Sequence, residues 1–120
     1  MAAPTAPLPD TVDDLVACFL AGTLPRAAWT HPAHLFVCRH LLVGSSPVEV
    51  LAELRVRIPE HNARVGLAPH HGGYHETITQ YFVGAVAATA PPTTAALLAA
   101  PACQRDAPLR HWSPARLGSV

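Results

Sequence analysis

The sequence predicts an all-α fold, a single-domain bundle of about four main helices with short C-terminal helices. Half of the 120 residues are hydrophobic, which suits one compact core and leaves no room for a separate cofactor domain. Apolar residues recur at helical spacing, whereas no segment shows sustained strand-like alternation and no Asn-Gly or Asp-Gly hairpin turn occurs. We therefore expect one helical domain over residues 1–120, with residues 1–9 as a disordered tail.

The first two helices are marked by capping residues and glycines. Thr11 heads a Thr-x-x-Asp capping pattern, and apolar residues then recur until Gly22. Thr30 can cap a second helix that tolerates Pro32 in its first turn and runs to Gly44. Because this second helix is nearly apolar around its circumference, we expect it at the centre of the bundle.

The third and fourth helices follow with equally local signals. Residues 46–49, Ser-Pro-Val-Glu, combine an N-cap, a first-turn proline and a capping-box glutamate. Pro59 should end or kink this helix, and residues 61–73 read as a loop. A fourth helix is expected from near His75 until Pro91-Pro92 stops it.

Two short helices are expected beyond that point. Residues 93–100 form an alanine- and leucine-rich segment, and Ser113-Pro114 resembles another helix start.

Composition narrows the class of function. Eight basic and eight acidic residues give a formal net charge of zero, which disfavours nucleic acid and anionic membrane surfaces as partners. No run approaches the roughly 18 apolar residues that a membrane span needs, and no signal peptide is recognisable. Three cysteines without CxxC spacing indicate neither a disulfide framework nor a zinc knuckle. We expect a cytoplasmic protein.

Eight histidines are the compositional anomaly, and three of them suggest a metal site. His31 and His34 are three residues apart and share one face of the second helix's first turn, a common arrangement for two metal ligands. His75 lies at the fourth helix's start, and antiparallel neighbours in a bundle would place both starts at the same end. Three imidazoles with an open coordination position suit catalytic zinc, copper or iron.

Several assignments near this site stay open. Glu76 is a fourth ligand, a general base, or simply an acid that favours the helix dipole. Tyr74 either orients a substrate or is a buried tyrosine with its hydroxyl at the rim. Trp29 is a core plug or a pocket wall. Helix starts also favour anions, so the same residues could bind a carboxylate or phosphate without a metal.

The remaining candidates carry weaker signals. His70 and His71 line the pocket, bind a second metal or are exposed in the loop, with exposure the expectation. His40 is expected to be structural because it falls on roughly the opposite helix face. Arg39, like Arg110, either clamps a carboxylate or is solvated. We expect the two other histidines, His61 and His111, to be core or surface residues whose hydrogen-bonding groups are satisfied.

Three segments resemble a family of small uncharacterised bacterial all-helical proteins. They are LPRAAWTHPAHLFVCRHLL, GGYHETITQYF and LRHWSPARLGS, which match an aromatic-[ST/N]-H-x-x-H-L motif, a Y-H-E-T-I-T motif and a [YW]-S-x-x-R-L motif. The resemblance spans about residues 24–118. It singles out His31, His34, Tyr74, His75, Glu76, Thr77, Thr79, Ser113 and Arg116. Cys38 departs from the small apolar residue usual there, which argues against it as a ligand.

Together these observations predict a small metal-dependent enzyme. His31, His34 and His75 would bind one divalent transition metal (zinc, copper or iron), with Glu76 and Tyr74 as catalytic residues acting on a small-molecule substrate, either by hydrolytic or lyase-type chemistry or by oxidation. The alternatives are a non-catalytic module that binds a metal, haem or a small anion in the same pocket, and a metal-free acid-base enzyme using His75 and Glu76. The oligomeric state, including a homodimer, stays open.

Overall fold

The computed structural model describes residues 9–66 and 76–110, and every regular element in these two ranges is a helix, as predicted. The α-helices and the short 3₁₀ helices, labelled η, are, in chain order, α1 (Val12–Ala21), η1 (Arg26–Ala28), α2 (His31–Gly44), α3 (Pro47–Arg64), α4 (Glu76–Thr89), α5 (Thr94–Ala99), η2 (Pro101–Cys103) and η3 (Ala107–Arg110). The predicted tail, most of the 61–73 loop and the helix expected at Ser113-Pro114 lie outside the described residues.

The predicted starts of the first three helices are confirmed by their capping hydrogen bonds. The hydroxyl of Thr11 accepts the amide of Asp14 at 3.0 Å, and the Thr30 hydroxyl accepts from the third residue of its helix. Ser46 and Glu49 form the reciprocal capping box, with distances of 3.2 and 3.0 Å. Each bond satisfies an amide that the first helical turn would leave without a partner.

Of the two outcomes predicted for Pro59, an end or a kink of the third helix, the end is wrong, because α3 continues past the proline. Helix α3 contains Pro59 and continues to Arg64, so residues 61–64 are helical rather than loop. A proline removes one helical hydrogen bond, but packing beyond it can outweigh this loss. Here Ile58, His61 and Asn62 are buried on both sides of the proline, and their burial keeps the helix intact.

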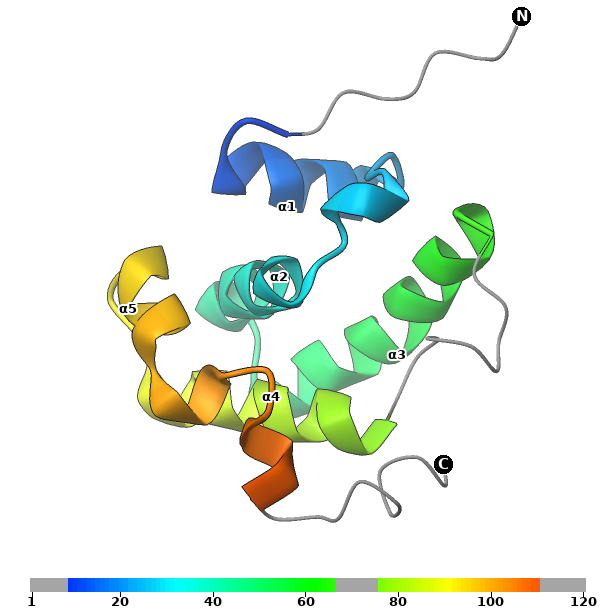
Figure 1. Cartoon of the computed structure of the whole chain (residues 1–120). Coiled ribbons are helices and arrows are strands. Elements are labelled where there is room, and N and C mark those ends of the chain that lie inside the picture. The colour runs from blue at the N-terminus through cyan, green and yellow to red at the C-terminus, as the bar shows by residue number, and fades with distance from the viewer. Residues whose placement is uncertain (1–8, 67–75, 111–120) are drawn as a thin grey trace, which may run out of the picture.

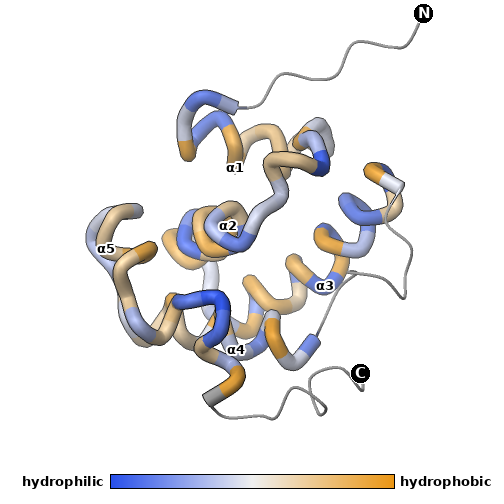
Figure 2. The backbone as a smooth tube through the Cα atoms, viewed as in Figure 1, coloured by the Kyte–Doolittle hydropathy of each residue, from blue (hydrophilic) through white to orange (hydrophobic). Residues whose placement is uncertain are grey.

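Helix α2 occupies the centre of the fold, as its apolar circumference predicts. Figure 1 shows α1 above it, α4 below it, α3 to the right and α5 to the left, and α2 contacts all four. Its buried residues join side chains of the other helices in one hydrophobic cluster. Figure 2 shows hydrophobic and hydrophilic residues alternating along α3, as expected for a helix with one face on such a core.

The chain after α4 folds back over α2 and α4. Helix α4 ends at Thr89, before the predicted stop at Pro91-Pro92, and Ala90 takes a left-handed conformation with φ of +44°. The guanidinium of Arg39 donates to the carbonyls of Pro91 and Pro92 at 3.2 and 2.9 Å, which fixes this corner to α2.

None of the helices in the described ranges is long and apolar enough to cross a membrane.

Candidate metal centre at the start of α2

His31 is the first residue of α2 and is held by the C-terminal part of the fold. Its Nε2 lies 2.8 Å from the carbonyl oxygen of Cys103 in η2. A carbonyl can only accept, so Nε2 carries the proton and the lone pair lies on Nδ1. The ring also packs edge-on against Phe82 of α4, with centroids 4.8 Å apart. Both contacts fix the orientation of the imidazole.

His34 lies one turn later and is held in a similar way. Its Nδ1 donates to the carbonyl of Thr30 at 2.7 Å, so the lone pair lies on Nε2. The ring lies against the indole of Trp29, with centroids 3.7 Å apart and planes inclined by 30°. Each of the two predicted ligands thus has one ring nitrogen bonded to a backbone carbonyl, while the other makes no hydrogen bond within the described residues.

The surroundings of His34 keep its ring neutral at neutral pH. The pKa of His34 is lowered to about 4, chiefly by burial and also by the imidazoles of His31 and His61, while the Thr30 hydrogen bond acts in the opposite direction. Some of the side chain remains accessible, but protein atoms surround the ring closely enough to disfavour its charged form. A neutral imidazole is the form that binds metals.

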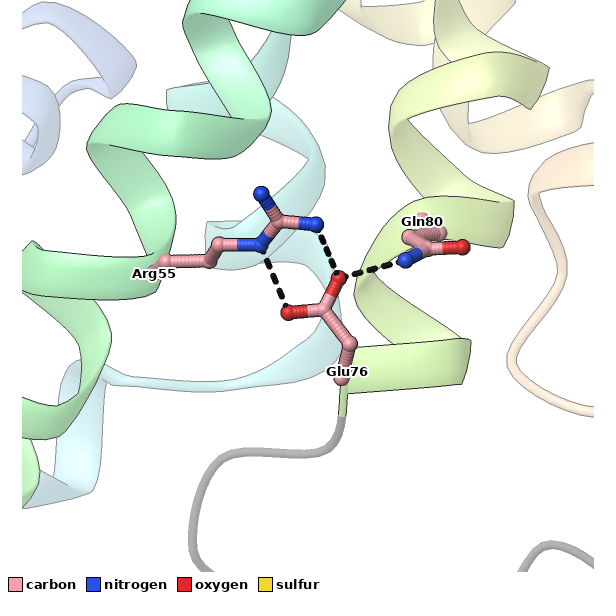
Figure 3. Close-up of polar contacts among 3 residues, drawn as sticks. All are labelled: Arg55, Glu76 and Gln80. Carbon is pink, nitrogen blue, oxygen red and sulfur yellow. Dashed lines mark hydrogen bonds and ion pairs between the residues drawn. The ribbon is translucent and has the colours of Figure 1, made fainter.

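Glu76 begins α4 and forms an ion pair with α3. Figure 3 shows the guanidinium of Arg55 meeting both carboxylate oxygens, at 2.8 and 2.9 Å, while Gln80 donates to one of them at 2.6 Å. A bidentate arginine fixes a carboxylate and ties the two helices together. An acid in the first turn also suits the helix dipole. These contacts give Glu76 a structural role, and its role as a base stays a prediction.

The candidate residues on α2 and α4 lie on neighbouring helices without meeting directly in the described structure. His31 contacts Phe82, six residues beyond Glu76, which is about 9 Å along the helix axis. Tyr74 and His75 lie outside the described residues. Within residues 9–66 and 76–110, no three His, Cys, Asp or Glu side chains are placed to hold a metal ion. Of the three predicted ligands, the described structure therefore contains His31 and His34, and their metal-binding role stays a prediction.

His61 is a neighbour of this site that the sequence did not single out. It is 1% exposed, its Nε2 donates to the carbonyl of Leu24 at 3.1 Å, and its ring lies 5.2 Å from that of Trp29. In the described part of the chain its Nδ1 has no hydrogen-bond partner. The spacing of Leu54, Ile58 and His61 would have placed it on the core face, had α3 been expected to continue past its proline.

Trp29 has the core role considered for it, and its role as a pocket wall stays a prediction. One face stacks on Phe19 of the hydrophobic core at 4.4 Å, and the indole also contacts His34. The tryptophan therefore connects the core to the imidazole site.

The start of α2 offers little to an anion. Thr30 bonds two amides of this turn. Its hydroxyl accepts from the amide of Ala33, and its carbonyl accepts from the amide of His34. Pro32 has no amide hydrogen. Only the amide of His31 remains in this turn, whereas anion sites at helix starts use several amides together.

The other predicted candidates lie apart from the site or outside the described residues. Cys38 is buried, and burial, together with the nearby thiol of Cys103, raises its pKa to about 12, so the thiol stays protonated and is a poor ligand. His40 is exposed on α2. The residues outside the described structure are His70, His71, His111, Ser113 and Arg116.

Neither a scan of protein-family models nor searches of curated proteins and solved structures found a match to this chain. The geometry of the residues is therefore the basis for a functional proposal.

Proposed function

We propose that the protein is a small metal-dependent enzyme whose metal is held by His31, His34 and His75. One observation carries the proposal: the two imidazoles on α2 each donate one N–H to a backbone carbonyl, at 2.8 and 2.7 Å. Metal-binding histidines commonly make this second bond, because it fixes the tautomer and orients the other nitrogen toward the ion. The lowered pKa of His34 supports the same proposal.

A divalent transition metal suits such a donor set. Imidazole nitrogens bind zinc, copper and iron, so the donors do not choose among them. Bound there, the metal would supply Lewis acidity or redox chemistry to a small-molecule substrate. In this proposal Tyr74 orients the substrate and Glu76 acts as base or additional ligand. The proposal includes a cytoplasmic location, which suits the three free cysteines.

A second candidate is a metal-binding module without catalysis. It is favoured by the ion pair between Glu76 and Arg55, because that pair engages both carboxylate oxygens in a contact between helices. Binding of a small anion alone is less well supported, since Thr30 and Pro32 leave one amide at the start of α2.

Metal titration of the untagged protein tests the proposal. After removal of bound metal with a chelator, wild type should bind one equivalent of zinc or cobalt by calorimetry. His34→Gln and His75→Gln should weaken binding by tenfold or more. His40→Gln is the matched control, because His40 lies exposed on the same helix, and it should bind as wild type does.

Two results would overturn the assignment. If wild type binds no stoichiometric metal, the metal-dependent function is wrong. If His75→Gln keeps full affinity, the three-histidine site is wrong. Loss of a metal-dependent activity in Glu76→Gln with unchanged metal affinity would separate an enzyme from a binding module.

A further inference from the structure

A second feature of the fold lies at the other end of α2. A pocket of about 440 Å³ opens between the last turns of α2 and α4. Leu42, Val43 and Ala87 contribute its apolar surface, Val86 is a buried residue of its lining, and Arg39 contributes a positive charge. Its volume falls within the range of small-molecule sites, roughly 300–1,000 Å³. Leu42 is eleven residues from His31, or about 16 Å along the helix, so the pocket is separate from the candidate metal centre.

Arg39 is the charged group of this pocket and is fixed in place. Its Nε and Nη2 bond the carbonyls of Pro91 and Pro92, which use one edge of the guanidinium. Three of its five N–H groups remain, and two of them form the end-on fork that matches a carboxylate. Within the described ranges no carboxylate lies at ion-pair distance from Arg39.

Two features of the pocket are unusual for a protein surface: a highly exposed valine and a strained backbone conformation. Val43 is 86% exposed although it lies in a helix with an apolar circumference. Ala90, at the pocket's edge, has φ of +44°, a conformation that costs a residue with a Cβ roughly 1 kcal/mol or more. Such strain is concentrated at binding sites. An exposed apolar surface beside a fixed, unpaired cation complements a ligand with an apolar tail and an anionic head.

We propose that this pocket binds a small alkyl monocarboxylate. The carboxylate takes the end-on fork of Arg39, and the alkyl chain lies on Leu42, Val43 and Ala87, with Val86 buried in the lining. The binding is independent of the metal proposed at the start of α2, so the two proposals fail or succeed separately.

Octanoate is the test ligand and octanol its neutral counterpart. The experiment uses methyl-labelled wild-type protein with excess chelator, so that no metal is bound. Octanoate should shift the NMR signals of Val43 and Val86 and leave those of Val56, an exposed valine on α3, unchanged. Octanol should bind at least about tenfold more weakly, because it lacks the charge-assisted hydrogen bonds.

Two variants divide the pocket into its charged and apolar parts. Arg39→Gln should weaken octanoate binding at least about tenfold, while Arg26→Gln, a change at an exposed arginine in η1, should have no effect. Ala87→Leu keeps Arg39 and fills the pocket, so it should also weaken binding, and it serves if Arg39→Gln does not fold.

Three outcomes would overturn the inference. They are the absence of shifts at Val43 and Val86 with millimolar octanoate, equal affinity for octanoate and octanol, and wild-type affinity in Arg39→Gln or Ala87→Leu.

Discussion

His34 shows how a single residue's surroundings prepare it for a role. It lies in an ordinary helical turn, yet Trp29 covers its ring and Thr30 fixes its tautomer. The spacing of His31 and His34 is readable in the sequence, because residues three apart share a helix face. The carbonyl that holds His31 belongs to Cys103, 72 residues away, and no local pattern indicates it.

The lowered pKa of His34 should make stability depend on pH. Folded His34 has a pKa of about 4 and the unfolded residue has the ordinary value of 6.5, so between these values the unfolded chain binds the extra proton. The free energy of unfolding should therefore fall as pH falls from 7 to 5, by up to about 2 kcal/mol from this residue. Urea denaturation of the metal-free protein at a series of pH values measures this change in the free energy of unfolding. His34→Gln should show a correspondingly flatter profile, and parallel profiles would contradict the assignment.

Elements were predictable where their determinants are local. Thr11, Thr30, Ser46 and Thr93 cap their helices through bonds to residues three positions ahead, a distance that the sequence fixes. The continuation of α3 was not predictable in this way. It depends on His61 reaching Leu24, which belongs to a different part of the chain.

Pro59→Ala should stabilise the protein. Alanine restores the amide hydrogen that an interior proline lacks, and position 59 is exposed, so no packing is lost. Part of this gain is offset because proline also restricts the unfolded chain, which leaves an expected increase of about 1–2 kcal/mol in the free energy of unfolding. Glu60→Ala, at the next exposed position, should change stability by less than about 0.5 kcal/mol. A destabilised Pro59→Ala would show that the proline is required.

At the end of α4, the same substitution to glycine should change stability in opposite directions at two positions. Ala90→Gly should stabilise the protein by about 1 kcal/mol, because glycine adopts positive φ without the steric cost that alanine has there. Ala88→Gly, two residues earlier in the regular helix, should cost about 0.5–1 kcal/mol. Thermal denaturation of both variants checks the pair, and a loss of stability in Ala90→Gly would rule out this account.

At the scale of the whole molecule, α2 and α4 are held together by the chain that follows them. The segment η2 accepts bonds from both helices, at Cys103 from His31 and at Ala102 from the hydroxyl of Tyr81. The sequence predicts the all-α bundle and its central helix from hydrophobic periodicity. It does not predict these bonds, since a backbone carbonyl has the same chemistry at every position.

Tyr81→Phe should loosen this closure without changing the helices. Loss of the 2.9 Å bond to Ala102 should lower the free energy of unfolding by about 1 kcal/mol. Hydrogen exchange at the Cys103 amide, which bonds Ala100 within η2, should become faster while exchange in α1 is unchanged. Unchanged exchange at Cys103 would mean that Tyr81 does not hold η2 in place.

The contact between Trp29 and His34 has a practical consequence as well as a structural one. An indole face interacts with a nearby cation through its π electrons, so a proton or a metal ion arriving on His34 changes the surroundings of the chromophore. With Trp112 replaced by phenylalanine, the emission of Trp29 becomes an intrinsic optical reporter of the imidazole beside it. The protein carries its own fluorescent probe for occupancy at the start of α2.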